Sequence, residues 1–378
     1  MIKHETQEAL EKAKDLDHVE VETRPSPHHM IREIYEQPDG VAETLAVCFQ
    51  DARRIVEQLD PEKIGMVYFT GSGTSYHACL AANYALAGLT KIFTSSLPAS
   101  EFPSWVRQMQ RKQTILIAIS QSGESVDVNT AVRTAVDSDM RVVVVTNTPE
   151  STLAKSSELR MVSKAGEEKA VTATKSFTAT LAAAYALVLE LARGSGISPH
   201  NYENLAADLK MAPDQVRQTL ALCDAKTRAL SAEFEGKEFF FILGSGPNYA
   251  TALEGALKLK ESCNLYAEGF ASREFLHGPM QLVDHRTPVF ILESPGETEQ
   301  ARRLTESFQR FGAPTVLIRQ TDGQSPSKEI GSVEVSANSA EIFSPLSYVV
   351  PLQLYAYYSS VIRGLNPDRP EKLKKVVK

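Results

Sequence analysis

The fold of this chain is set by residues 238–261, which read EFFFILGSGPNYATALEGALKLKE. Phe239 to Leu243 form an unbroken apolar run, the pattern of a strand that is buried on both faces of a parallel sheet. Gly244-Ser245-Gly246 then predicts a tight turn, and Pro247 suits the first position of a helix. The stretch therefore predicts a strand, a glycine turn and a helix, which is the unit of an α/β sheet.

The same unit occurs 173 positions earlier, where residues 66–73 read MVYFTGSG. At the same spacing, Gly123-Glu124-Ser125 pairs with Gly296-Glu297-Thr298, and residues 142–145 pair with residues 315–318. Three matches at one spacing predict an α/β fold of two tandem domains, each a doubly wound parallel sheet between two layers of helices. We expect a polar leader over residues 1–27, a first domain over 28–203 and a second domain over 204–378. The segment from Asn204 to Phe234 is expected to be helical and to bridge to the second domain.

Composition narrows the class of protein. The 378 residues carry a formal charge of −7, so no basic excess points to nucleic acid as a partner. The cysteines show no metal or disulfide spacing, which predicts a reducing, cytoplasmic setting without a metal site. The charged residues 1–17 do not form a signal peptide, and the mostly apolar segment 181–191 is too short for a membrane span and predicts a buried helix.

The helix after Pro247 carries Glu254, Lys258 and Glu261 at positions i, i+4 and i+7, so all three lie on one face. One interpretation is a surface stripe of ion pairs at helical spacing. The other is a general acid/base site at the end of a parallel sheet. The spacing alone leaves both open.

Two loops of the first half follow predicted strands and precede predicted helices. They contain small and hydroxyl residues, namely Gly73, Thr74, Ser75, Ser120, Gln121, Ser122 and Ser125. Helix N-termini bind anions, so two such loops favour a small phosphate ester, although ordinary turns and helix caps explain either loop alone. Neither loop has the lysine of a nucleotide phosphate loop, and the dinucleotide fingerprint fails at Tyr76, so we expect no cofactor.

The second half lacks this loop chemistry. Glu293 and Pro295 stand at the positions equivalent to Ser120 and Ser122, and Pro247 removes a backbone donor. We therefore expect the phosphate in the first half and the carboxylates in the second. His277, followed by Gly278-Pro279, is either a structural or exposed histidine or a further member of this site.

Several motifs resemble a known family. They are HMIREIYEQP at residues 29–38, GTSY at 73–76, SQSGE at 120–124, TKSF at 174–177, LEGALKLKE at 253–261 and HGP at 277–279. In combination they resemble the sugar isomerase (SIS) family, in particular the isomerase domain of glucosamine-6-phosphate synthase and the related phosphosugar isomerases and deaminases. The resemblance covers about Pro27 to the C-terminus.

The resemblance implies roles for individual residues. The residues that it assigns to binding the sugar phosphate are Ser75, Ser120, Gln121, Ser122 and Ser125, with Val171 contributing its backbone. It implies that Glu261 is the base that moves a proton between C1 and C2, with Glu254 and Lys258 positioning the reacting groups. It implies that His277 opens the sugar ring from the partner subunit of a homodimer with shared sites. Lys375, or the adjacent Lys374, takes the place of a substrate-contacting lysine in the tail.

Two positions depart from the family pattern. Ala173 stands where the synthase has a serine near the sugar, and Leu276 replaces a lysine. We expect no glutaminase domain with an N-terminal cysteine ahead of the isomerase part. We therefore expect interconversion of glucosamine-6-phosphate with fructose-6-phosphate and free ammonia. A deglycase of phosphorylated sugar–amine adducts and a non-catalytic sugar-phosphate sensor are the alternatives.

Two further features favour a homodimer. The loop 268–280 holds the apolar Phe270, Phe275 and Leu276, which would be poor surface residues in a monomer. The apolar helix expected over residues 175–191 needs cover on more than one face, which a twofold interface would supply.

Overall fold

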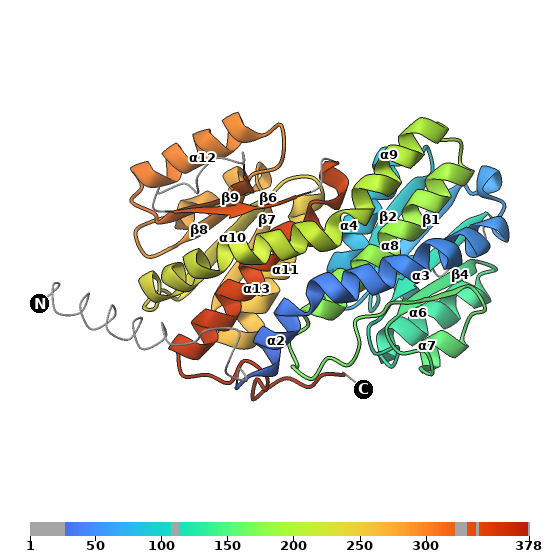
Figure 1. The fold of residues 1–378 in the computed structure, drawn as a ribbon, viewed down its shortest axis with the longest axis horizontal. Coiled ribbons are helices and arrows are strands. Elements are labelled where there is room, and N and C mark those ends of the chain that lie inside the picture. The colour runs from blue at the N-terminus through green and yellow to red at the C-terminus, as the bar shows by residue number, and fades with distance from the viewer. Residues whose placement is uncertain (1–26, 107–112, 322–330, 338–339, 377–378) are drawn as a thin grey trace, which may run out of the picture.

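The protein folds into two α/β lobes that lie side by side (Figure 1). The structure is a computed structural model, and it describes residues 27–106, 113–321, 331–337 and 340–376. The leader expected over residues 1–27 therefore lies outside the described residues, apart from Pro27.

The first lobe contains a five-stranded sheet in the order β2-β1-β3-β4-β5, with every neighbouring pair parallel. Its strands are β1 (Met66–Gly71), β2 (Phe93–Pro98), β3 (Thr114–Ile119), β4 (Arg141–Thr146) and β5 (Arg160–Val162). Side chains of one face pack on α3 (Gln37–Glu57), α4 (Thr74–Leu89) and α8 (Lys175–Gly194). Those of the other face pack on α5 (Phe102–Val106), α6 (Val126–Asp137) and α7 (Thr152–Lys155). The lobe is thus a three-layer unit.

The second lobe has the same construction. Its parallel strands β6 (Phe239–Gly244), β7 (Tyr266–Ala271), β8 (Val289–Leu292), β9 (Thr315–Gln320) and β10 (Ser332–Val335) lie in the order β7-β6-β8-β9-β10. One face packs on α12 (Thr298–Arg310), and the other on α10 (Ala212–Glu233), α11 (Pro247–Cys263) and α13 (Pro345–Ile362). The predicted α/β class with two doubly wound parallel sheets is confirmed.

The glycine turns that open α4 and α11 have matching geometry. Gly73 has φ +54° and Gly246 has φ +52°, a region that side chains rarely adopt. Each glycine follows the first strand of its lobe in the chain and immediately precedes a helix. The turn therefore requires glycine at both positions, Gly73 in the first lobe and Gly246 in the second.

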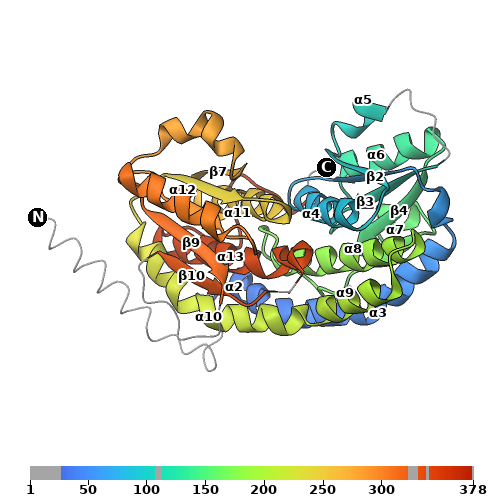
Figure 2. The ribbon, with the colours of Figure 1, turned by 90° about the horizontal axis from the view of Figure 1, so that it is seen from above.

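Long helices join the lobes. In Figure 2, α3 and α10 run along one side of the molecule, and α4 and α11 face each other between the two sheets. The apolar residues on the inner faces of both sheets belong to one continuous buried cluster that includes α8 and α13. The boundary predicted between residues 203 and 204 falls within α9 (Pro199–Lys210).

Two expectations concern helices. The segment 204–234, expected to be helical, lies in the two helices α9 and α10, because the first helix ends at Lys210 and α10 has Pro213 in its first turn. Helix α8 needs no partner subunit to cover it, since its residues from Lys175 to Ala192 are all buried within this chain. By length and composition α8 could cross a membrane, but a single helix buried throughout a fold is weak evidence for a span.

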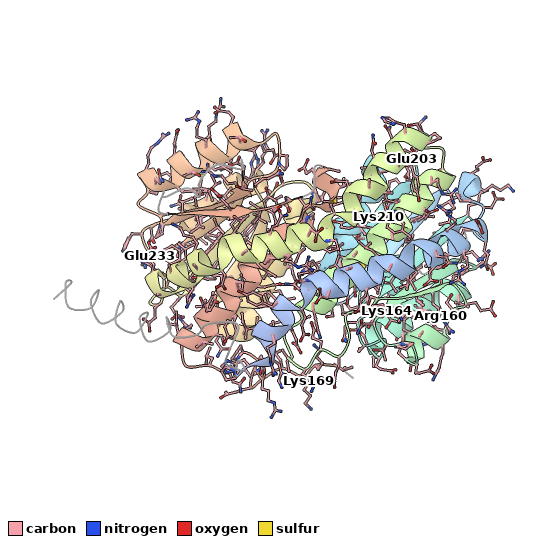
Figure 3. All side chains as sticks on the ribbon, viewed as in Figure 1. Arg160, Lys164, Lys169, Glu203, Lys210 and Glu233 are labelled. Atoms are coloured by element: carbon pink, nitrogen blue, oxygen red, sulfur yellow. The ribbon has the colours of Figure 1, made fainter. Side chains whose placement is uncertain are left out.

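The surface mixes charges of both signs. The exposed side chains labelled in Figure 3 alternate in sign along α9 and α10, with Glu203 and Lys210 on α9 and Glu233 at the end of α10. All four cysteines are free and buried. Short 3-10 turns complete the described elements: η1 (Pro61–Lys63), η2 (Glu274–His277), η3 (Pro279–Leu282) and η4 (Glu341–Phe343), together with the short helix α2 (His29–Tyr35).

Candidate active site

A cavity of about 300 Å³ opens at the carboxyl edge of the first sheet. This edge of a doubly wound sheet is where ligands generally bind. Its volume is at the small end of the range for small-molecule sites. Most of the residues predicted to form the site line it, namely Gly73, Thr74, Ser75, Ser120, Gln121, Ser122, Ser125, Val171, Glu261 and Lys375.

Three helices begin at this cavity. The first turns of α4, α6 and α8 each contribute lining residues, including Thr74, Val128 and Ser176. The free N–H groups and positive dipole ends of these helices favour an anion there. Lys374 and Lys375 add positive charge from the C-terminal tail, and Asp127 is a carboxylate in the same wall.

The loop hydroxyl groups are arranged to donate. Ser120 Oγ accepts a hydrogen bond from Gly123 N at 3.1 Å, and Ser122 Oγ accepts one from Glu124 N at 3.2 Å. Because each oxygen already accepts from the backbone, its own hydrogen can point at a ligand oxygen. Ser125 lines the cavity and is the N-cap residue of α6. Its side chain forms no capping hydrogen bond with this helix, so its hydroxyl group is available to a ligand. This donor-rich wall suits a phosphate group.

The equivalent place in the second lobe is filled by protein side chains. Asn248 Nδ2 donates to Ser294 Oγ at 3.1 Å and to Ser344 Oγ at 3.0 Å. A side chain added at Gly246 would come within 3.4 Å of Glu341 Oε1. The carboxylate of Glu341 and the missing N–H of Pro247 both disfavour an anion there. These contacts support a phosphate site in the first lobe.

The three charged residues of α11 form a buried network where α11 packs on α4. The side chains of Glu254 and Lys258 are 0% exposed, and that of Glu261 is 22% exposed. Lys258 Nζ lies 3.1 Å from Glu254 Oε1 and donates to Glu261 Oε2 at 2.7 Å and to Thr74 Oγ1 at 3.0 Å. The interpretation of these residues as a surface stripe of ion pairs is therefore wrong.

The network keeps its members charged despite burial. Burial by itself raises the pKa of Glu254, but Lys258 and His77 outweigh it and lower this pKa below its usual range. Burial would lower the pKa of Lys258, but the carboxylates of Glu254 and Glu261 raise it above its ordinary value. Glu261 is the member of the network that reaches the cavity, so its carboxylate is placed to exchange a proton with a bound molecule.

A further part of the cavity wall, which includes Ser176 and Lys375, depends on Glu168, a residue that was not predicted from the sequence. Its buried carboxylate accepts from Thr174 N at 2.8 Å, from Ser176 Oγ at 2.6 Å and from Lys375 Nζ at 2.6 Å. Burial favours a raised pKa, but Lys375 and these donors lower the pKa of Glu168. Lys375 also donates to the carbonyl oxygen of Ala170 at 2.6 Å. The predicted tail lysine thus lines the cavity while anchored to its wall, and Lys374 lines the cavity beside it.

The HMIREIYEQP motif supports the same wall from outside. The Asp368 carboxylate accepts from the backbone N–H groups of His29 and Met30, both at 2.8 Å, and Val171 N donates to the Asp368 carbonyl oxygen at 3.0 Å. Glu33 accepts from the backbone N–H groups of Lys169 and Ala170. Helix α2 therefore holds together the loop that carries Val171 and the tail that carries Lys375.

His277 lies apart from the cavity of its own chain. It is exposed on η2 and is not among the residues that line the cavity in the described part of the chain. The neighbouring Phe275 is 0% exposed and packs on Phe241, Phe270 and Phe308 of the same lobe. The expectation that this aromatic loop needs a partner is therefore wrong for Phe275, whereas Leu276 is 46% exposed.

The amino-acid sequence of this chain matches a known protein family. The SIS domain matches the chain twice, over residues 62–190 and 233–363. The chain belongs to the SIS domain family. The two SIS segments correspond to the two lobes, and the resemblance stated from the motifs is confirmed.

The chain is also similar to individual proteins and solved structures. The chain is 35% identical over 365 residues to glutamine–fructose-6-phosphate aminotransferase (isomerizing) from Pyrobaculum aerophilum, a match that covers 93% of this chain and 57% of the relative. The chain thus spans little more than half the length of that relative. Among solved structures, the C-terminal domain of glucosamine-fructose-6-phosphate aminotransferase from Francisella tularensis superposes with a TM-score of 0.81 at 28% identity, covering 91% of this chain and 98% of that one. Glucosamine-6-phosphate deaminase from Thermotoga maritima shares the fold, with a TM-score of 0.73 at 24% identity and coverage of 92% and 99%.

Proposed function

We propose that this chain is a phosphosugar isomerase that interconverts glucosamine-6-phosphate with fructose-6-phosphate and ammonia. The observation that carries the proposal is the position of Glu261. Its carboxylate shares one small cavity with the anion-binding ends of three helices. A phosphate bound by Ser120, Ser122 and Ser125 would hold the sugar chain within reach of this base.

The chemistry needs two proton transfers and one water molecule. In the open-chain aldehyde, Glu261 removes the proton from C2 and returns it to C1, while a second proton passes from the amine nitrogen to O1, which converts the 2-amino aldose into a 2-imino ketose. Water then adds to C2 and ammonia leaves, so that glucosamine-6-phosphate and water become fructose-6-phosphate and ammonia. Lys258 stays charged and donates a hydrogen bond to Glu261 Oε2 at 2.7 Å, which fixes the position of the carboxylate that accepts the proton.

The names of the relatives support this substrate class. One is an aminotransferase of fructose-6-phosphate, and one that shares the fold is a deaminase of glucosamine-6-phosphate. Both names contain a hexose 6-phosphate, which matches a cavity with a phosphate-binding wall and a volume of about 300 Å³. We further propose that His277 opens the ring from a second subunit, since it is exposed and lies outside the cavity of its own chain.

The test is ammonia release from glucosamine-6-phosphate by the purified protein. Glu261→Gln should lower kcat by roughly 10² to 10⁴, the usual worth of a general base, while substrate binding is largely kept. Glu203→Gln, an exposed glutamate on α9, is the matched control and should leave turnover unchanged. Normal turnover in a folded Glu261→Gln protein would exclude this residue as the base.

One observation favours a second candidate, the deglycase. Ala173 lines the cavity, and its methyl group leaves more room than a serine hydroxyl group would. A substrate with a substituted amine would use this room, and the same base would release a larger amine. Faster turnover of an N-substituted fructosamine-6-phosphate than of glucosamine-6-phosphate would favour this reaction.

A further inference from the structure

His77 makes a close contact across the boundary between the two lobes. It lies on α4 of the first lobe, and its Nδ1 is 2.7 Å from Glu254 Oε2 on α11 of the second. The His77 side chain is 12% exposed and that of Glu254 is 0% exposed. Because Glu254 is held as a carboxylate, Nδ1 carries the hydrogen and donates it.

The hydrogen bond from His77 gives the second carboxylate oxygen of the buried Glu254 a partner. Glu254 Oε1 accepts from Thr74 Oγ1 at 3.0 Å and lies 3.1 Å from Lys258 Nζ. Within the part of the chain that the structure describes, His77 is the donor that serves the other oxygen. A fully buried carboxylate that loses a donor must find another or take up a proton, since an unsatisfied charge is costly there.

Lys258 is the group that would respond. Its ammonium has three hydrogens and three neighbouring acceptors, Thr74, Glu254 and Glu261, so its position is a balance between the two carboxylates. It now lies closer to Glu261, at 2.7 Å, than to Glu254, at 3.1 Å. Without His77, Glu254 would attract the ammonium more strongly and draw it away from Glu261.

We propose that His77 is a positioning residue for Glu261, acting through Glu254 and Lys258. The proposal rests on the proposed role of Glu261 as the base. Thr74 and His77 lie three residues apart, on one face of α4, and the same helix begins at the phosphate-binding wall. Helix α4 therefore contacts both the phosphate-binding wall in the first lobe and the charged network around Glu261 in the second lobe.

The test compares three substitutions. His77→Leu removes the donor, and should lower kcat by roughly tenfold to a hundredfold with KM within about threefold, as expected for a displaced base. His77→Asn, whose amide nitrogen takes the place of Nδ1, should restore most of kcat. His77→Gln, which moves the donor further along the side chain, should restore less. If the leucine variant does not fold, a higher kcat in His77→Asn than in His77→Gln still tests whether the donor position matters. Ser96→Ala is the control, because it removes a 3.2 Å hydrogen bond to Cys79 O on α4 away from the network and should leave kcat unchanged.

Two further measurements separate this role from general damage and from failure of the proposed function. In the Glu261→Gln background, His77→Leu should have little additional effect, since both act through one group. In a crystal structure of His77→Leu, Lys258 Nζ should lie closer to Glu254 than to Glu261, a result that depends on no substrate. An unchanged Lys258 position, a wild-type kcat in His77→Leu, or an undiminished loss in the Glu261→Gln background would overturn the proposal. If the wild type releases ammonia from no sugar phosphate, the proposed function fails, and the crystal structure still decides the role of His77.

Discussion

Replacing Lys258 with methionine should destabilise the protein by about 3–5 kcal/mol at pH 7, the usual cost of removing one partner from a buried ion pair. Both Lys258 and Glu254 have 0% exposed side chains, so water cannot take over the lost contact. Methionine keeps most of the side-chain volume, which limits the packing loss. Lys260→Met, on the same helix but exposed, is the matched control and should cost less than about 0.5 kcal/mol.

The stability lost in Lys258→Met should increase as the pH rises. In the wild type, burial opposes ionisation of Glu254, but Lys258 and His77 lower its pKa below the ordinary 4.5, so its charge contributes stability above that pH. Without Lys258, burial would raise the pKa, and the variant would fold with Glu254 protonated. Each pH unit above the ordinary pKa then costs up to about 1.4 kcal/mol, so the deficit grows from pH 5 to pH 7.

Urea denaturation of both variants at pH 5, 6 and 7 measures this deficit directly. The double variant Glu254→Gln/Lys258→Met should recover at least half of the loss, because it removes the uncompensated charge and keeps an acceptor for His77. A deficit that does not change with pH, or one no larger than that of Lys260→Met, would show that the network is not held as a charged, buried unit.

Three other predictions concern the substrate site. Ser122→Ala should weaken binding of a sugar phosphate in a calorimetric titration roughly tenfold, whereas Ser245→Ala should leave it unchanged; the reverse order would place the phosphate in the second lobe. Mixing inactive His277→Ala and Glu261→Gln subunits should restore roughly a quarter of wild-type activity, since half of randomly assembled dimers are mixed and each has one intact site; no recovery after proven subunit exchange would mean that each chain builds its own site. Glu168→Gln should raise KM roughly tenfold by releasing the lysine of the tail, and an unchanged KM would show that this ion pair does not hold the wall.

The central strands of each sheet could be predicted because they are buried on both faces and leave an unbroken apolar run. The predicted run Phe239 to Leu243 lies in β6, and residues 142–145, paired with the second half by their spacing, lie in β4. The edge strands β2 and β7 could not be recognised from their sequences. Their sequences, FTSSLP and YAEGFA, mix polar and small residues, because an edge strand is partly exposed and its pairing depends on the neighbouring strand.

The candidate site could be predicted where its chemistry is local. The loop around Ser120 and Ser122 is recognisable from its composition, and the face of Glu254 and Glu261 from its helical spacing. Glu168 and His77 were missed, because the ion-pair partner of Glu168, Lys375, lies 207 residues away and the partner of His77, Glu254, lies 177 residues away in the chain. For His77 a signal was available, since it lies three residues after Thr74 on the same helical face. The sequence does not show which helix packs against this face, so the partner of His77 could not be predicted.

The continuous apolar cluster that covers the inner faces of both sheets has a consequence for how this protein acquires and loses its structure. Neither lobe buries its own inner helices alone, since α8 of the first lobe packs on α13 of the second. We therefore expect folding to be cooperative over the described chain, with one calorimetric transition rather than one for each lobe. A chain cut between the lobes would expose this shared surface on both fragments and favour aggregation over reassembly.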